Sequence, residues 1–132
     1  MTPDRNVALV LVDHGSRSAA ANASLEMVAR EVAVMAEGRY IAVLAAHMEI
    51  ASPTVGEAFD AAVAAGAECV VVCLYFLAPG RHSIEDVPRL AAEAAARHPG
   101  LRYEVSTPLG PDPSVSSLVL TRAAEALTHR HR

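Results

Sequence analysis

The chain contains no lysine and no tryptophan, and only 4% of its 132 residues are aromatic. Its 11 strong positive charges are therefore all arginines. Without lysine, the sequence can build neither a phosphate-binding P-loop nor a Schiff-base mechanism. The net charge of -4 also argues against nonspecific binding to nucleic acid, because such binding depends on lysine and arginine side chains that neutralise phosphates.

Cysteine is scarce as well, and both copies, Cys69 and Cys73, fall within one apolar run. In a strand their Cα atoms would lie about 13 Å apart, whereas a disulfide spans at most about 7 Å. We therefore expect two buried thiols and no local Cys/His zinc motif. The first apolar segment is only about seven residues long, too short to cross a bilayer, and no export signal accompanies it. These features favour a cytoplasmic protein without a membrane segment.

Apolar runs of strand length alternate with segments whose apolar residues recur every three or four positions, as on one face of a helix. The strands are expected at residues 7–12, 40–46, 69–76 and 101–105. The helical stripes are expected over residues 25–36, 55–63, 87–95 and 115–126. Unbroken apolar strands are typical of a parallel sheet that is covered by helices on both faces.

This order predicts one α/β domain over residues 1–132, a doubly wound, flavodoxin-like fold with a four-stranded parallel sheet flanked by helices. The tail, residues 128–132, could bind a metal ion through His129 and His131, but a frayed, solvated terminus is the expectation. Ser52 and Asp112 each precede a proline and are expected to cap helices. Asp86 is expected to cap a helix that begins at Val87.

Ligands of doubly wound proteins bind outside the carboxyl ends of the strands, and the expected loops there carry the unusual residues. His14 follows the first strand, Glu49 the second and His82 the third. Imidazole and carboxylate groups bind divalent iron, cobalt, nickel or zinc, and they also accept protons. Each residue alone has a simpler explanation, such as a loop hydrogen bond for His14 or a helix-dipole interaction for Glu49. Together they predict one site, and His47 either points into the same cleft or packs within its loop.

Three segments in these loops resemble the small sirohydrochlorin chelatases of the CbiX/SirB type, which are class II tetrapyrrole chelatases. The segments are residues 13–17 (Asp-His-Gly-Ser-Arg), 49–53 (Glu-Ile-Ala-Ser-Pro) and 76–88, which run from Phe-Leu-Ala-Pro-Gly-Arg-His to Asp-Val-Pro. The resemblance covers essentially the whole chain. It implies a chelatase-like fold and a lyase that inserts Co²⁺ or Fe²⁺ into sirohydrochlorin without ATP, in cobalamin or sirohaem biosynthesis. A related nickel enzyme makes Ni²⁺ a further candidate.

The resemblance also implies the roles of the residues and the assembly of the chain. His14 and His82 would handle the metal ion, which is a substrate rather than a permanently bound cofactor, and Glu49 would lie beside them. Small members of the family are similar to one half of a two-domain chelatase and act as homodimers. A homodimer that binds a tetrapyrrole and a divalent ion, but neither nucleic acid nor membrane, is therefore expected.

Metal insertion requires that the ion lose its water shell and that two protons leave the pyrrole nitrogens. Neutral imidazoles can replace water as temporary ligands. Glu49, or whichever imidazole is not bound to the metal, can then accept the protons. The substrate carries several carboxylates, so Ser16, Arg17 and Arg81 are candidates to bind its edge.

Three other functions would use similar residues. A metal or tetrapyrrole carrier would use the same His/Glu site, and only turnover separates it from an enzyme. A histidine phosphatase needs arginine where this chain has Asp13, and an anionic neighbour would repel phosphate. A phosphate-accepting signalling domain needs an acceptor aspartate where this chain has Phe76 and Leu77.

Overall fold

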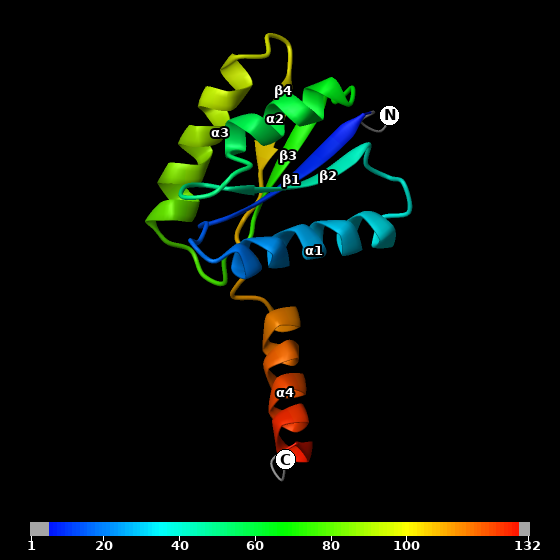
Figure 1. Cartoon of the computed structure of the whole chain (residues 1–132), viewed down its shortest axis with the longest axis vertical. Helices are drawn as coiled ribbons and strands as arrows, with labels where there is room; N and C mark the ends of the chain where they lie inside the picture. The colour runs from blue at the N-terminus through cyan, green and yellow to red at the C-terminus, as the bar shows by residue number, and fades with distance from the viewer. Residues whose placement is uncertain (1–5, 130–132) are drawn as a thin grey trace.

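The structure is a computed structural model that describes residues 6–129 (Figure 1). Four parallel strands form one sheet in the order β2-β1-β3-β4. The strands are β1 (Val7–Asp13), β2 (Ala42–His47), β3 (Cys69–Leu74) and β4 (Arg102–Val105). The helices are α1 (Ala19–Met35), α2 (Val55–Ala64), α3 (Val87–Ala96) and α4 (Pro113–Thr128), with one π-helical turn, η1 (His82–Asp86), directly before α3. The predicted α/β fold with a four-stranded parallel sheet is confirmed.

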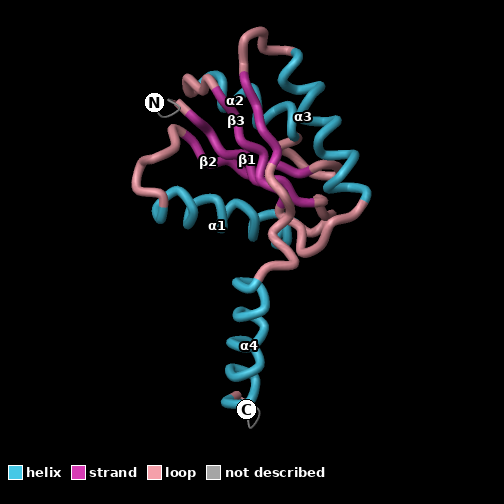
Figure 2. The backbone as a smooth tube through the Cα atoms, turned by 180° about the vertical axis from the view of Figure 1, so that it is seen from behind, coloured by secondary structure: helices cyan, strands magenta, loops and turns pink. Residues whose placement is uncertain are grey.

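Helices cover the two faces of the sheet unequally. Figures 1 and 2 show α1 on one face and α2 and α3 on the other. Alternate residues of a strand point to opposite faces, so β1 serves both cores. Leu9 and Leu11 pack with Leu25 of α1, whereas Val10 and Val12 pack with Phe59 of α2 and its neighbours.

The helix starts differ from two of the three predictions. Asp112 caps α4, since its Oδ1 accepts a hydrogen bond of 2.9 Å from the Ser114 amide, as predicted. The predicted cap at Ser52 is wrong, because Thr54 caps α2 through a capping box with Glu57. The predicted cap at Asp86 is also wrong. The backbone of Asp86 is already helical where η1 continues into α3, and its side chain makes no capping bond.

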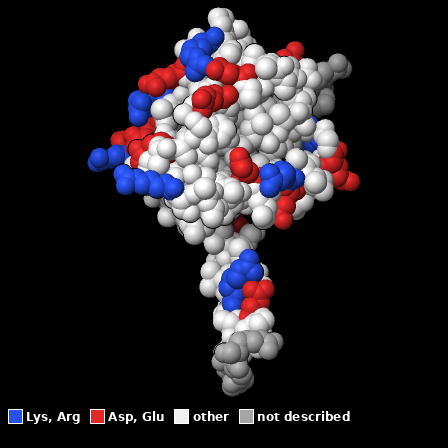
Figure 3. Space-filling model, viewed as in Figure 1, with Lys and Arg blue, Asp and Glu red and all other residues white. Residues whose placement is uncertain are grey.

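The last helix stands apart from the rest of the chain. α4 projects away from the sheet in Figures 1 and 2, and none of its residues is buried. Its surface is largely uncharged in Figure 3 apart from one patch, where Arg122 and Glu125 form an ion pair of 3.0 Å. The predicted apolar stripe therefore exists, but it has no partner within the described chain.

The end of the chain is described only in part. Thr128 ends α4 and His129 is its C-cap, while residues 130–132, and with them His131, lie outside the described part of the chain. The fraying of residues 128–132 stays a prediction.

Cys69 is buried and Cys73 is half-buried, and both are free thiols. From residue 6 to residue 129, no helix has the length and apolar character needed to cross a membrane; the cytoplasmic location stays a prediction.

Candidate active site

The strand order brings three loops to one edge of the sheet. β1 lies between β2 and β3. The chain therefore passes from β1 to β2 on one side of β1, and then crosses over to β3 on the other side. This change of direction creates a switch point at the carboxyl end of β1, which is where doubly wound folds bind ligands. His14 directly follows β1, Glu49 follows β2, and His82 begins η1 after β3.

His14 contacts both of the other predicted residues. Its Nε2 lies 3.2 Å from Oε2 of Glu49. Its ring meets the ring of His82 edge to face, with 4.6 Å between centroids and 61° between planes. All three side chains are about half exposed, so they are open to an incoming ligand. The structure thus joins residues that are up to 68 positions apart, from His14 to His82.

His82 has a carboxylate partner on its other ring nitrogen. Its Nδ1 lies 2.9 Å from Oδ2 of Asp86, one turn further along η1. Arg89 approaches the other oxygen of Asp86 at 4.0 Å. A carboxylate that accepts from Nδ1–H fixes the tautomer and the orientation of an imidazole, and it leaves Nε2 as the nitrogen that can bind a metal ion.

A second imidazole–carboxylate pair lies at the base of the site. His47 is only 1% exposed, and its Nδ1 lies 2.6 Å from Oδ1 of Asp13. These two residues are partners in the register of β1 and β2. Of the two interpretations of His47, packing is therefore the one that the structure supports. Because His14 follows Asp13 directly, this pair anchors the loop that carries His14.

The backbone around Glu49 is tightly constrained. Gly15 has a φ of +96°, and a Cβ atom there would lie 2.0 Å from the carbonyl oxygen of Glu49. The same oxygen accepts a hydrogen bond of 2.8 Å from the Ala51 amide, which closes a γ-turn around Ile50 with a φ of +76°. This conformation is strained for a β-branched residue. Such strain clusters at functional sites, where the surrounding structure holds it, and here it presents Ile50 to solvent.

The three residues expected at the edge of the substrate occupy the surrounding loops. The Ser16 hydroxyl already accepts a hydrogen bond of 3.0 Å from the Ser18 amide, and the Ser16 backbone is bonded to the Asn22 side chain. Arg17 is exposed. Arg81 is exposed beside His82 and lies 3.6 Å from Glu85. The two arginines are therefore open to a ligand, whereas Ser16 mainly shapes its loop.

Two contacts in the site were not predicted from the sequence. Asp86 is the partner of His82, and Asp13 is the partner of His47. Asp86 could have been found, because residues four apart on a helix lie on the same side. The Asp13–His47 pair carries no local signal, since it depends on the register between two strands.

The side chains of the site do not form a complete metal-binding site. Within the described part of the chain, no three His, Cys, Asp or Glu side chains are placed to hold one ion. Nε2 of His14 faces Glu49 instead. An ion that binds this nitrogen must therefore displace the Glu49 carboxylate, which would then be available for another task.

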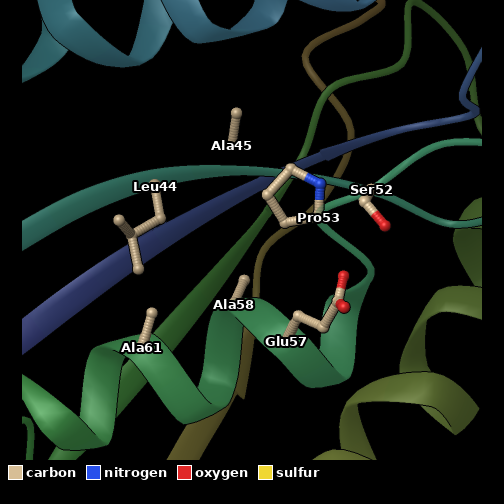
Figure 4. A pocket seen from close by; sticks show the side chains of 7 residues that line it. All are labelled: Leu44, Ala45, Ser52, Pro53, Glu57, Ala58 and Ala61. Atoms are coloured by element: carbon tan, nitrogen blue, oxygen red, sulfur yellow. The ribbon is translucent and has the colours of Figure 1, made fainter.

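A separate pocket of about 390 Å³ opens between β2 and α2 (Figure 4). It is lined by Leu44, Ala45, Ser52, Pro53, Glu57, Ala58 and Ala61. Its only ionisable group, Glu57, belongs to the capping box, and a hydrogen bond from the Thr54 backbone lowers the pKa of this carboxyl group. No imidazole or thiol lines this pocket, so it lacks the groups for metal chemistry.

Comparison with known proteins agrees with the arrangement of the three loops. The model of the CbiX family matches residues 8–126. The chain belongs to the CbiX family. The resemblance found in the sequence is therefore confirmed over almost the whole domain, including all three loops that carry His14, Glu49 and His82.

Relatives of this CbiX-family chain include enzymes named for two metals. It is 40% identical over 123 residues to the chloroplastic sirohydrochlorin ferrochelatase of Arabidopsis thaliana, and the match covers 92% of this chain and 53% of the relative. It is 33% identical over 141 residues to the sirohydrochlorin cobaltochelatase of Methanopyrus kandleri, with 92% and 97% covered. The chain thus spans about half the length of the first relative and nearly all of the second.

Solved structures of the family have the same fold. A putative cobalamin biosynthesis CbiX protein from Marinobacter aquaeolei superposes with a TM-score of 0.77 at 28% identity, covering 92% of this chain and 98% of the other. The sirohydrochlorin chelatase SirB from Bacillus subtilis, solved in complex with cobalt, superposes with a TM-score of 0.77 at 27% identity, covering 91% of this chain and 50% of SirB. SirB has also been solved with Fe³⁺.

Proposed function

We propose that this chain inserts a divalent metal ion, Co²⁺ or Fe²⁺, into sirohydrochlorin. The observation that carries the proposal is the contact of His14 with both Glu49 and His82 at the switch point of a CbiX-family sheet. Relatives named as ferrochelatase and cobaltochelatase, and SirB structures with cobalt and Fe³⁺, support the choice of metals and of tetrapyrrole. The ion is a substrate, and the reaction needs neither a resident cofactor nor ATP.

The two imidazoles receive the ion. His82 offers Nε2, because Asp86 holds its Nδ1. His14 offers Nε2 once the ion has displaced Glu49. Neutral nitrogen ligands replace part of the water shell, yet they bind loosely enough to pass the ion to the four nitrogens of the ring.

Glu49 then acts as the base. Two pyrrole N–H protons must leave as the ion enters, since the metallated ring holds a divalent cation as a dianion. The displaced Glu49 carboxylate accepts one proton, and an imidazole that has released the ion accepts the other. Because Glu49 contacts His14 before the metal ion binds, the ion displaces the Glu49 carboxylate when it binds His14. The same step therefore makes the carboxylate available as the base.

Apolar side chains on the same loops suit the flat face of a tetrapyrrole. Ile50, Leu77 and Ile84 are 60%, 69% and 65% exposed, respectively, and they belong to the loops that carry Glu49 and His82. Exposed apolar groups that gather near a polar site are typical of ligand surfaces. Arg17 and Arg81 bind the peripheral carboxylates, and the Ser16 hydroxyl contributes a hydrogen bond.

We further propose that the chain acts as a homodimer. It matches only 53% of the Arabidopsis relative and 50% of SirB, so a second copy supplies what the remaining half supplies in those longer chains. The unpartnered apolar side of α4 supports association of this kind.

The test is anaerobic incubation of the purified chain with sirohydrochlorin and Co²⁺, Fe²⁺ or Ni²⁺ while the absorption of the tetrapyrrole is followed. We expect multiple turnovers above the uncatalysed rate, with loss of turnover in the His14→Ala and His82→Ala variants. His129→Ala, which removes an imidazole at the end of α4, is the control and should retain the rate. A change that stops at one equivalent would indicate a carrier, and no change with any of the metals would overturn the proposal.

A further inference from the structure

Ile50 combines two features that are unfavourable in a folded chain. Its backbone has a φ of +76°, which a β-branched residue adopts only under strain. The hydrogen bond from the Ala51 amide to the Glu49 carbonyl makes it the central residue of a γ-turn of the rare, strained kind. Its side chain is 60% exposed and belongs to neither core cluster. Packing within the described chain therefore offsets little of this strain.

The other residues with a positive φ are easier to explain. Among the described residues other than glycine, only Asn6, Glu37 and Ile50 have one. Asparagine is common in this region of backbone space. Glu37 has an unbranched Cβ atom and lies between α1 and β2, at the amino edge of the sheet and away from the site. Ile50 is thus the one β-branched member of the group, and it lies in a loop of the site.

The loop between β2 and α2 cannot easily relax out of this conformation. The His47 amide donates to the Pro53 carbonyl at 2.8 Å and closes the base of the loop. Along its side, the Glu49 amide donates to the His14 carbonyl at 3.3 Å. Gly15 packs so closely that a Cβ atom there would lie 2.0 Å from the carbonyl oxygen of Glu49. The surrounding backbone therefore holds the strained turn in place.

The turn lies directly beside the proposed base. Oε2 of Glu49 is 3.2 Å from Nε2 of His14, and Ile50 is the next residue of the loop. A macrocycle whose central nitrogens reach Glu49 extends beyond them in every direction of its plane, so it covers the adjacent residue of the loop. Contact with the ring would remove the exposed isoleucine side chain from water, which is favourable.

We propose that Ile50 is a substrate-binding residue that packs against the apolar face of the tetrapyrrole and holds the ring at Glu49. The strain of the γ-turn is then compensated only in the complex, where the ring buries the side chain. Ile50 therefore lowers the stability of the free protein and raises its affinity for the substrate. This role separates it from Leu77 and Ile84, which are equally exposed but have no positive φ. The inference rests on the proposed function, in which a tetrapyrrole is the substrate.

The first experiment measures the thermal unfolding of the ligand-free protein. The Ile50→Asn variant should have a higher Tm than the wild type, because asparagine accepts a positive φ with less strain. Glu37→Asn relieves strain of the same kind at the opposite edge of the sheet, so it is the matched control and should also raise Tm. A Tm that does not rise in Ile50→Asn would show that the isoleucine stabilises the free protein, and this would overturn the inference.

The second experiment titrates metal-free sirohydrochlorin into each protein without oxygen and follows the absorption of the ring. We expect Ile50→Asn to bind the ring about 10-fold more weakly or worse, because it loses one apolar contact. Ile50→Leu keeps the apolar volume and should bind as the wild type does, and so should Glu37→Asn. The affinity for Co²⁺, measured by calorimetry, should be the same in all four proteins. Equal affinities of Ile50→Asn and Glu37→Asn for the ring would overturn the inference.

Binding of the metal-free ring does not depend on metal insertion, so the two proposals fail separately. A wild type that binds sirohydrochlorin through Ile50 but inserts no metal would contradict the proposed function alone. A wild type that turns over, with an Ile50→Asn variant that binds the ring equally well, would contradict the inference alone. A wild type that does not bind the ring would contradict both.

Discussion

Asp86 holds the Nδ1 nitrogen of His82 at 2.9 Å within a single π-helical turn, and this leaves Nε2 as the imidazole nitrogen that a ligand can use. π-Helical turns are rare and are frequently found at functional sites. Here the turn places both members of the pair directly before α3. In the proposed reaction, Asp86 therefore acts on the metal ion through His82, as a positioning residue.

The Asp86→Asn variant should bind Co²⁺ about 10- to 100-fold more weakly, which is the usual effect of removing such a partner. The amide can still accept from Nδ1–H, but it no longer carries the charge that strengthens the imidazole as a ligand. Calorimetric titration with Co²⁺ and the pH profile of turnover measure the effect. Glu93→Gln, which changes an exposed carboxylate of α3, is the control. Unchanged Co²⁺ affinity and an unchanged pH profile in Asp86→Asn would remove the positioning role.

Glu49→Gln should separate metal binding from proton transfer. The amide has the same shape and can keep its place beside His14, but it cannot accept a pyrrole proton. We expect Co²⁺ binding within a few-fold of the wild type and a kcat that falls about 10²- to 10⁴-fold, the usual contribution of a general base. Stopped-flow absorption of the tetrapyrrole measures kcat, and titration measures binding. A variant that binds Co²⁺ and keeps its full kcat would show that another group takes the proton.

Gly15→Ala should destabilise the domain by about 1–3 kcal/mol, because it combines a positive φ with a steric clash. The new Cβ atom would lie 2.0 Å from the carbonyl oxygen of Glu49, so the Glu49 loop must move as well. Gly66→Ala is the matched control. Gly66 has a φ of +104°, but a Cβ atom there meets nothing within 4 Å. Thermal unfolding should show the larger loss for Gly15→Ala, and equal losses would mean that the contact with Glu49 adds nothing.

The strands, and the meeting of the three candidate residues at one edge of the sheet, could be predicted from the sequence for physical reasons. β1 is buried on both faces, so it forms an unbroken apolar run that no amphipathic helix would show. Parallel strands end at one edge, so residues that follow β1, β2 and β3 must meet there. His14, Glu49 and His82 were found in this way.

The features that could not be predicted depend on contacts between segments that are far apart in the sequence. The Asp13–His47 pair requires the register between β1 and β2. The apolar side of α4 was visible in the sequence, but its projection away from the sheet depends on how Leu109 and Gly110 anchor the connection. The misplaced cap of α2 is a different case. Thr54 and Glu57 form a capping-box pattern that the sequence alone shows, and this pattern lies directly after the Ser52-Pro53 pair.

Asp60 should make the stability of the domain depend on pH, because it joins α2 to the end of α3. Its Oδ1 lies 2.7 Å from Nε2 of His98, and Arg97 binds its other oxygen. The hydrogen bond to His98, followed by the charge of Arg97, lowers the pKa of this carboxyl group below its ordinary value of 3.8. A lowered pKa in the folded state gives stability that is present above the ordinary pKa and is lost as the pH falls through the folded-state pKa.

The Asp60→Asn variant should therefore have a lower Tm than the wild type near neutral pH, and the difference should shrink as the pH falls from about 5 to about 2. The effect is modest, since the group is exposed and solvent screens its charge. Thermal scans of both proteins over this pH range measure it. Glu93→Gln, which breaks the exposed pair with Arg89 within α3, is the control and should change Tm less at neutral pH. A Tm difference for Asp60→Asn that is constant across the range would contradict the pH dependence, because it would mean that the loss comes from packing and not from the ionised carboxylate.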